Sequence, residues 1–331
     1  MPRPYEELLR IPLAIAPTPL QRLERLSAAL GGPEIWIKRD DLTGAGGGGN
    51  KVRKLEYLMG EAMARNADVV VTAGAVQSNH VRQTAAVCGS LGLACEAVLT
   101  EVAPGRSADY LRSGNVFLTR LFGAKVHVVP QDADTTSEME KIAARLRGEG
   151  RRPYIVPIGG SSPLGALGYV TAGLELCEQA RAMRLGMDAV VIASGSGGTQ
   201  AGLLGGLALG GSSARVLGFS VSAPEPRQRQ KVLDILPGLG ALIGRSIPAQ
   251  AVHIDDASIG PGYGVPSAPM KEALEMVAKL EGLPLDPVYT AKAMAGLIRL
   301  CRKGELRAGQ KVVFLHTGGL PGLFGYCGEL A

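Results

Sequence analysis

The sequence has few aromatic side chains and no long apolar run. Only 4% of its 331 residues are aromatic, with a single Trp, so the core must be largely aliphatic. No apolar run reaches the roughly 18 residues that a membrane-spanning helix needs. The first twenty residues, where Pro17 and Pro19 interrupt a short apolar piece, lack the layout of a signal peptide. We therefore expect no membrane partner and a cytoplasmic location.

Charge, histidine and cysteine are sparse as well. The net charge is +5, from 35 Lys and Arg against 30 Asp and Glu, and these charges are scattered. A nucleic-acid-binding surface needs a basic face with interleaved aromatic residues, so we expect no nucleic-acid partner. Four His and five Cys residues, with no CxxC pair, predict no metal site. They also favour a reducing compartment, in which the thiols are mostly buried.

Glycine, in contrast, is present in excess. There are 46 glycines, about one residue in seven and roughly twice the ordinary share. Neither collagen nor a disordered tract fits, because there is no G-X-Y period and 46% of the residues are apolar. We interpret the chain as globular and enzyme-like, with backbone that closely approaches other backbone or a ligand.

Short apolar runs alternate with helical patterns along the chain. This alternation predicts an α/β fold with two open, twisted, mostly parallel sheets flanked by helices. The expected strands are 35–38, 69–73, 94–99, 125–129, 189–193, 216–221 and 312–315. The expected helices are 51–65, 77–91, 136–148, 165–184, 200–209, 267–280 and 289–303. The least periodic stretch, 227–258, is expected to be peripheral.

A lysine follows the longest glycine run. The loop GAGGGGN at 44–50 opens an expected helix, but asparagine before the lysine and valine after it exclude a Walker A phosphate loop. Lys51 then lies at a helix N-terminus, where the helix dipole, Arg53 and Lys54 are expected to disfavour its charged form. A neutral amine is what imine formation with a carbonyl cofactor requires. The alternative is a surface lysine after a flexible loop.

A second glycine-rich loop follows the expected strand 189–193. Its sequence SGSGGT, at 194–199, lies directly before an expected helix, so N–H groups and hydroxyls could surround one phosphate at the helix N-terminus. Gln200 replaces the third glycine of a dinucleotide motif, and no acidic residue clearly ends the next strand. The pattern favours a monophosphate site, with a tight connection that binds nothing as the alternative.

Further polar side chains lie near other strand ends. Residues 77–80 follow the run VVVTA, and they could bind a carboxylate or cap the following helix. Thr317 follows the last expected strand and could bind a ligand or form a turn. Tyr263 and Tyr289 lie on loops before helices, where a tyrosine can act as an acid or base or can simply pack.

These loops are expected to surround one cleft, because the carboxyl ends of parallel strands meet at one edge of a sheet. An imine-forming lysine together with a monophosphate site, without a metal or a dinucleotide acid, indicates pyridoxal 5′-phosphate as the cofactor.

The motifs together resemble the pyridoxal-phosphate enzymes of fold type II, the tryptophan-synthase-β-like fold, in the branch of D-cysteine desulfhydrases and 1-aminocyclopropane-1-carboxylate (ACC) deaminases. The resemblance covers nearly the whole chain, from PTPLQRLERLS through GGNKVRKLE, TAGAVQSNHVRQTAA, YIVPIGGSSPLGALGYV, ASGSGGTQAGL, GYGVPS and LDPVYTAKAMAGLI to FLHTGGLPGLFGY. It implies a larger cofactor-binding domain (1–50 and 165–331), a smaller domain (51–164), an active site in the cleft between them, and a homodimer.

The resemblance also implies residue roles. Lys51 is expected to hold the cofactor and to move the proton of the substrate Cα, with Ser78, Tyr263 and Tyr289 as further catalytic residues. Asn79 is expected to bond the ring hydroxyl of the cofactor. The other implied cofactor contacts are Asn50, Ser194, Gly195, Ser196, Gly197, Gly198, Thr199 and Thr317. The implied substrate contacts are Gln77, Ser78, Asn79, His80, Tyr289 and Thr290.

Two threonines indicate the activity within this branch. The deaminases are expected to carry Glu at the position of Thr290 and Leu at that of Thr317. A neutral hydroxyl facing the pyridine nitrogen cannot keep it protonated, which weakens the electron sink and favours β-elimination of a good leaving group. The predicted reaction converts the small amino acid D-cysteine to pyruvate, hydrogen sulfide and ammonia. L-cysteate sulfo-lyase, ACC deaminase and a non-catalytic module that binds a phosphate ligand stay open as alternatives.

Overall fold

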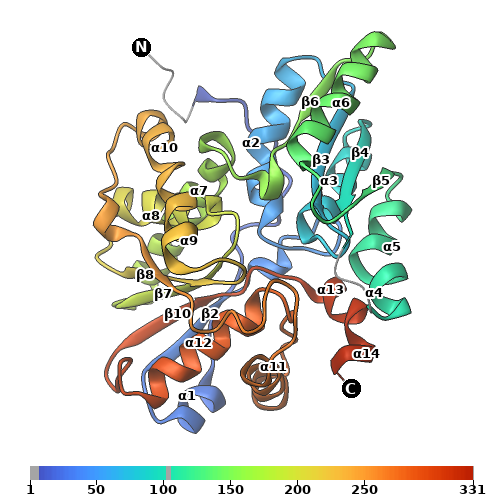
Figure 1. Ribbon diagram of the computed structural model, residues 1–331. Helices are drawn as coiled ribbons and strands as arrows, with labels where there is room; N and C mark the ends of the chain where they lie inside the picture. Colours follow the sequence, from blue (N-terminus) through green and yellow to red (C-terminus); the bar gives the residue numbers. More distant parts are fainter. Residues whose placement is uncertain (1–6, 102–105, 331) are drawn as a thin grey trace.

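The computed structural model describes residues 7–101 and 106–330, in which the strands form two separate sheets (Figure 1). The larger sheet has the order β1-β2-β10-β7-β8-β9, and β1 runs antiparallel to β2 while the other pairs are parallel. The smaller sheet, β5-β4-β3-β6, is entirely parallel. The predicted fold class is confirmed. The strands are β1 (Leu20–Arg22), β2 (Glu34–Lys38), β3 (Val69–Ala75), β4 (Ala94–Thr100), β5 (Lys125–Val129), β6 (Pro153–Ile155), β7 (Ala189–Ser194), β8 (Arg215–Ser220), β9 (His253–Asp255) and β10 (Lys311–Leu315).

Helices cover the sheets and connect their strands. They are α1 (Glu24–Leu30), α2 (Lys51–Ala64), α3 (Asn79–Ser90), α4 (Ala108–Arg112), α5 (Gly114–Leu121), α6 (Thr135–Gly148), α7 (Pro163–Ala182), α8 (Gly198–Leu209), α9 (Glu225–Leu233), α10 (Leu236–Ile243), α11 (Ala268–Glu281), α12 (Thr290–Arg302), α13 (Leu320–Gly325) and α14 (Cys327–Leu330). Three short 3₁₀ turns, η2 (Asp40–Leu42), η3 (Ile158–Gly160) and η4 (Ala249–Ala251), complete the described elements. In the described part of the chain no helix is both long and apolar enough to cross a membrane.

Strand β7 shows why the strands read as continuous apolar runs. All six of its residues are buried. Val190 and Ile192 join one apolar cluster with α7 and α8, whereas Ala189 and Val191 join another with α11 and α12. A parallel strand that is covered by helices on both faces must be apolar on both.

Part of the glycine excess serves packing between α7 and α8. A Cβ atom at Gly173 would lie 2.9 Å from the Cα of Gly206, and one at Gly202 would lie 2.1 Å from the carbonyl oxygen of Ala166. Both distances are shorter than real Cβ contacts, so the two helices approach through their backbones. These glycines support the layer beneath the site rather than a ligand.

The stretch 227–258 was expected to be peripheral, and this expectation is wrong. It contains most of α9 and all of α10, and Val232, Leu236, Leu239 and Ile243 belong to the larger core cluster. The two helices have nine and eight residues, which is too short for a clear helical period. The strands β1, β6 and β9 also escaped prediction, since each has only three residues.

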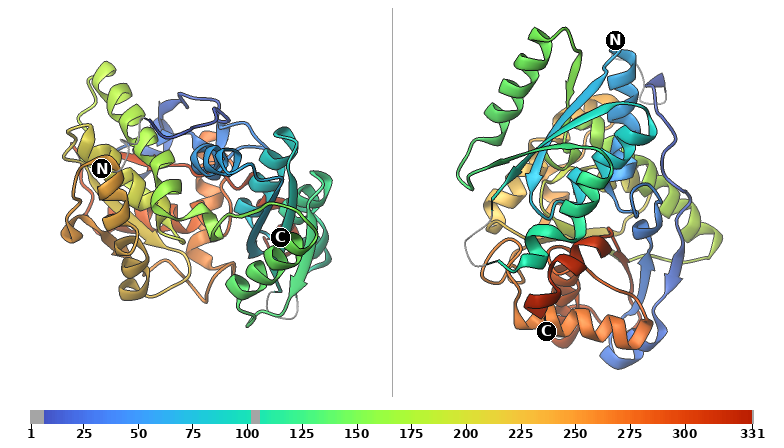
Figure 2. Two further views of the ribbon diagram at one scale, coloured as in Figure 1. Left: turned by 90° about the horizontal axis from the view of Figure 1, so that it is seen from above. Right: turned by 90° about the vertical axis from the view of Figure 1, so that its right-hand side faces the viewer.

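The strands of the smaller sheet all lie between residues 69 and 155. This sheet and its helices stand to one side of the larger sheet (Figure 2). Helix α2 bridges the two parts, because it packs against α3 and also against α7. The expected domain boundaries at 50/51 and 164/165 stay a prediction.

Candidate active site

Four helix N-termini meet at one place, those of α2, α3, α8 and α12. Asn50, which precedes α2, donates from Nδ2 to Thr199 Oγ1 of α8 at 3.0 Å. The backbone N–H of Lys51 donates to Gln83 Oε1 of α3 at 3.1 Å. A Cβ at Gly195 would lie 3.3 Å from Tyr289, which precedes α12. Helix N-termini carry partial positive charge, so this convergence suits anionic groups such as phosphate and carboxylate.

Lys51 is the first residue of α2 and is half-buried. Burial lowers the pKa of its amine to about 8, and a hydrogen bond with Lys54 partly offsets this effect. The sequence analysis attributed a lowered pKa to the helix dipole and to the charges of Arg53 and Lys54, and the part that concerns these two charges is wrong. Arg53 points away from Lys51 and is bound by Asp40 and Glu175. Desolvation therefore produces the reactive amine.

Lys54 lies one helical turn further along α2, and the sequence analysis gave it no role at the site. Its side chain is fully buried, and Nζ donates to the carbonyl of Gly159 and to Ser161 Oγ, both at 3.1 Å. Burial holds the pKa of Lys54 well below its ordinary value, and the nearby Lys51 lowers it further. Ser161 Oγ also donates to Ser196 Oγ at 2.7 Å and accepts from the N–H of Gly198 at 3.2 Å.

These groups gather donors around the N-terminus of α8, whose N-cap residue, Gly197, has no side chain to cap it. Gly197 has a φ of +85°, and a Cβ there would lie 2.8 Å from the carbonyl oxygen of Lys231, so only glycine fits the loop. An uncapped helix N-terminus beside a buried lysine fits a phosphate. The sequence signal for the missed Ser161 was the GGSS segment at 159–162, another glycine–hydroxyl loop between a strand and a helix.

Ser194 was expected to contact the cofactor, but its hydroxyl makes hydrogen bonds to two glutamines. Its Oγ donates to Gln200 Oε1 at 2.7 Å and accepts from Gln228 Nε2 at 3.0 Å. The side chain is buried, and through these bonds it supports the loop 194–199. Ser196, Gly198 and the neighbouring Thr199 are the members of the loop that meet Ser161 or Asn50.

The N-terminus of α3 brings together Ser78, Asn79 and His80. Ser78 caps the helix by accepting from the N–H of Val81 at 3.2 Å. Asn79 Oδ1 accepts from Asn115 Nδ2 at 2.9 Å. His80 is buried, its Nε2 lies 2.9 Å from Thr72 Oγ1, and its Nδ1 has no hydrogen-bond partner among the described residues.

Burial holds the pKa of His80 well below its ordinary value, and the charges of Lys51 and Lys54 lower it further. His80 is therefore a neutral imidazole with one free nitrogen beside the two lysines. An unpartnered buried polar atom of this kind is consistent with a place for a ligand.

Gln77 was expected to contact the substrate, but its side-chain amide makes hydrogen bonds within the protein. Its Nε2 donates to the carbonyls of Tyr110 and Ser113 at 2.6 and 2.9 Å, and its Oε1 accepts from the N–H of Asn115 at 2.9 Å. Gln77 thus fixes α4 and α5 against α3. The structure gives this side chain a supporting role instead.

The two tyrosines form a pair across the site. The hydroxyls of Tyr263 and Tyr289 lie 2.7 Å apart, and their rings meet edge to face at a centroid distance of 6.0 Å. Burial raises the pKa of Tyr263 to about 12 and that of Tyr289 well above its ordinary value. Both phenols are therefore neutral at physiological pH, and one can donate to the other.

Thr290 and Thr317 differ in their surroundings. Thr290 Oγ1 donates to Asp286 Oδ1 at 2.7 Å, and the same carboxylate accepts from the N–H groups of Val288, Tyr289 and Thr290. The hydroxyl of Thr290, expected to contact substrate, is thus part of the cap of α12. Thr317 is also buried, and its carbonyl accepts from the N–H of Asn50 at 3.0 Å, which places it next to α2.

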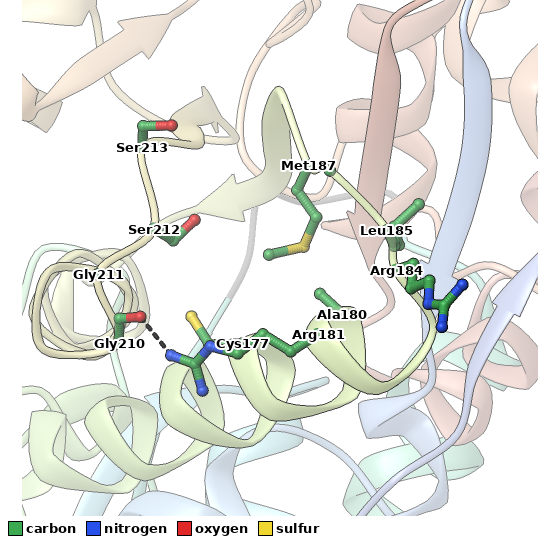
Figure 3. A pocket seen from close by; sticks show the side chains of 11 residues that line it. Cys177, Ala180, Arg181, Arg184, Leu185, Met187, Gly210, Gly211, Ser212 and Ser213 are labelled. Atoms are coloured by element: carbon green, nitrogen blue, oxygen red, sulfur yellow. Dashed lines mark hydrogen bonds between the residues drawn. The ribbon is translucent and has the colours of Figure 1, made fainter.

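A surface hollow elsewhere in the molecule contains none of the expected site residues. Figure 3 shows it between the C-terminal ends of α7 and α8, lined by residues that include Cys177, Met187 and Ser213. Arg181 donates across it to the carbonyl of Gly210. It lies away from the convergent helix N-termini. Within the described residues no cluster of His, Cys, Asp or Glu could hold a metal ion.

The fold and the site define a class of protein: an α/β enzyme in which lysines with lowered pKa values lie where helix N-termini that suit an anionic group meet. The family model of pyridoxal-phosphate dependent enzymes matches residues 11–318, and the chain belongs to this family. Pyridoxal phosphate is its cofactor. The uncapped α8 N-terminus, the buried Lys54 and the free nitrogen of His80 fit such a group.

Individual relatives show which members of this family the chain is similar to. The chain is 44% identical over 326 residues to a D-cysteine desulfhydrase of Salmonella newport (strain SL254), covering 98% of both chains. The same values hold for a D-cysteine desulfhydrase of Salmonella typhi. A crystal structure described as that of an ACC deaminase homologue is 39% identical, with a TM-score of 0.89, over 98% of this chain and 96% of the other.

Proposed function

We propose that this chain is a D-cysteine desulfhydrase. D-cysteine and water would give pyruvate, hydrogen sulfide and ammonia through loss of the Cα proton and departure of the thiol from Cβ. The full-length similarity to D-cysteine desulfhydrases supports this choice of substrate. The observation that carries the chemistry is the Lys51 amine, whose pKa is lowered to about 8 where four helix N-termini meet.

The chain's own residues have separable tasks in this proposal. Lys51 holds the cofactor and then takes the proton from the substrate Cα. Lys54, Ser196, Gly198 and Thr199 bind the phosphate, aided by the N-terminal N–H groups of α8. Bound pyridoxal phosphate supplies an electron sink for the pair left on Cα.

The substrate would lie between α3 and the tyrosine pair. The N–H groups at the start of α3, with Ser78 and Asn79, bind its carboxylate. Tyr263 and Tyr289 border Cβ, and their neutral phenols can donate a proton to the departing thiolate. His80 stays neutral and contributes a hydrogen bond rather than charge. Thr317 faces the ring of the cofactor as a neutral group.

We also propose the domain division, the oligomeric state and the location of the protein. The larger domain comprises 1–50 and 165–331, the smaller comprises 51–164, and the site lies in the cleft between them. The active protein is a homodimer that works in the cytoplasm, in line with a reducing compartment for its unpaired cysteines.

A panel of substrates tests the proposed function. Purified protein with pyridoxal phosphate is given D-cysteine, L-cysteine, L-cysteate, β-chloro-D-alanine or ACC, and pyruvate, 2-oxobutyrate, sulfide and sulfite are measured separately. We expect fastest formation of pyruvate and sulfide from D-cysteine. Faster release of sulfite from L-cysteate, or of 2-oxobutyrate from ACC, would reject the proposal in favour of the sulfo-lyase or the deaminase. A protein that binds the cofactor but turns over nothing would favour a binding module.

A further inference from the structure

Tyr263 lies on a loop that does little to hold itself in place. Residues 256–266 connect β9 to α11 and form neither helix nor strand. Inside this loop, the described backbone hydrogen bonds are those of Ile259 to Asp256 and Val265 to Gly262, at 3.2 and 3.3 Å. Such long bonds and glycine-rich backbone do not fix the position of a side chain. The place of the Tyr263 phenol must therefore depend on contacts with other elements.

A single amine from α12 makes two of those contacts. Lys292 is fully buried, and its Nζ donates to the carbonyls of Ile259 at 2.7 Å and Gly262 at 2.6 Å. Gly262 directly precedes Tyr263. Lys292 lies one helical turn after Tyr289, whose hydroxyl meets that of Tyr263. One helix thus presents one tyrosine and anchors the loop that presents the other.

On the other side of Tyr263, Arg106 donates to the carbonyl of Gly264 at 2.9 Å. Arg106 is paired with Glu329 and lies over the ring of Tyr110, so it is held by charge and by an aromatic face. The described hydrogen bonds of Lys292, in contrast, all go to loop carbonyls.

A buried ammonium of this kind carries a stability cost. Burial lowers the pKa of Lys292 to about 8, and Asp286 offsets this effect only in part. A methionine would fill similar space on α12 without desolvating a charge. The fold of α12 alone therefore gives no reason for lysine at this position, whereas the loop does.

We propose that Lys292 is a positioning residue, which holds the carbonyls of Ile259 and Gly262 and so sets the phenol of Tyr263 against Tyr289. This inference rests on the proposed function in one respect, since that function places the two phenols at the reacting atoms. Lys292 itself touches neither substrate nor cofactor, and its effect on turnover passes through Tyr263.

The first test is a double-mutant cycle on the cofactor-loaded enzyme with D-cysteine. We expect Lys292→Met to lower kcat about tenfold to a hundredfold, as misplacement of a catalytic group by about 1 Å does, with KM changed less. In a Tyr263→Phe background the same change should lower kcat by less than about twofold, because the group that Lys292 positions is already missing. Equal losses in both backgrounds would overturn the proposal, as would an unchanged kcat.

The second test does not depend on turnover. Tyrosines are labelled with ¹³C at Cζ, and the Tyr263 signal is identified by its loss in Tyr263→Phe. We expect Lys292→Met to move or broaden this signal, while Lys303→Met, an exposed lysine at the end of the same helix, leaves it in place. An unmoved Tyr263 signal in Lys292→Met would contradict the proposal.

The two tests also separate this inference from the proposed function. If the unaltered chain does not turn over D-cysteine, the proposed function fails. The Tyr263 signal then still tests whether Lys292 positions Tyr263. If Lys292→Met does not fold, Lys292→Gln, which keeps one donor on a shorter chain, takes its place in both experiments with the same criteria.

Discussion

The first turn of α2 carries two kinds of buried cation with opposite surroundings. Arg53 Nε donates to Asp40 and Nη1 to Glu175, both at 2.9 Å. Burial alone would lower the pKa of Arg53, but these carboxylates raise it above the ordinary value. Lys54 is also buried and Lys51 is half-buried, yet the described structure pairs neither with a carboxylate, and the pKa of each is lowered.

This difference distinguishes an ion pair that supports structure from the amines to which the proposed function assigns chemistry. A compensated cation is permanently charged and fixes η2, α2 and α7 against one another. An uncompensated amine gives up its proton easily and can then attack a carbonyl; beside a bound anion, by contrast, the protonated form is favoured. The four predictions below test this contrast, from the largest expected effect to the smallest.

The largest effect should come from loss of the reactive amine. Lys51→Ala should lower turnover of D-cysteine by at least about a thousandfold, because the proposed function assigns to Lys51 both the hold on the cofactor and the transfer of the Cα proton. Visible absorbance that borohydride removes should disappear as well. Lys51→Arg, which keeps the charge but cannot form an imine, should be equally inactive. Turnover within tenfold of the unaltered enzyme in either variant would exclude Lys51 from this role.

Loss of the compensated cation should affect folding instead. Arg53→Met leaves the buried Asp40 without its ion-pair partner and the half-buried Glu175 with Lys38 alone, which should reduce the free energy of unfolding by about 3–5 kcal/mol. Urea unfolding measures this change. Arg65→Met, which breaks an exposed pair with Glu61 at the other end of α2, should cost less than about 1 kcal/mol. Equal losses in the two variants would contradict the structural role of Arg53.

Loss of the second amine should weaken cofactor binding. A phosphate beside Lys54 favours the protonated amine, so Lys54→Met removes one charge-assisted hydrogen bond, and the Kd for pyridoxal phosphate should rise about tenfold to a hundredfold. Fluorescence titration of the cofactor-free protein measures it. Pyridoxal, which lacks the phosphate, provides the matched probe, and its Kd should change little. A parallel loss for both ligands would show that Lys54 does not act on the phosphate.

The smallest effect concerns pH. Neutral amine reacts with the cofactor, so a Lys51 pKa of about 8 predicts that the rate of cofactor capture rises about tenfold from pH 7 to pH 9 and then levels off. A lysine with an ordinary pKa of about 10.4 would instead show a rise of nearly a hundredfold over this range, with no plateau. Stopped-flow absorbance distinguishes the two profiles. A continued rise above pH 9 would contradict the lowered pKa.

Much of the fold could be predicted, since its signals are local. Each of the seven expected strands is present, because a strand buried on both faces is a continuous apolar run. The three missed strands have three residues each, and α9 and α10 are too short to show a period. Edge strands and short helices are stabilised by their neighbours, so their own sequence carries a weak signal.

The sequence singles out several side chains that the structure brings together, but it does not predict their contacts, and their roles at the site stay a prediction. Lys51, Ser78, Thr199 and Thr317 could be singled out because each follows a strand or a glycine loop. Chain-distant partners decide which side chains remain free. Gln228 occupies the hydroxyl of Ser194, and Asp286 occupies that of Thr290; likewise, residues of α4 and α5 occupy the amide of Gln77.

The sequence by itself determined the α/β class, the glycine loops and the lysine that follows one of them. These depend on backbone freedom and on apolar patterning, which neighbouring residues specify. The tertiary structure decided whether the pKa of each cation is raised or lowered. Arg53 and Lys54 are adjacent in the chain, but one meets two carboxylates and the other meets a carbonyl and a hydroxyl. Protonation follows desolvation and nearby charge, and only the packed molecule fixes those.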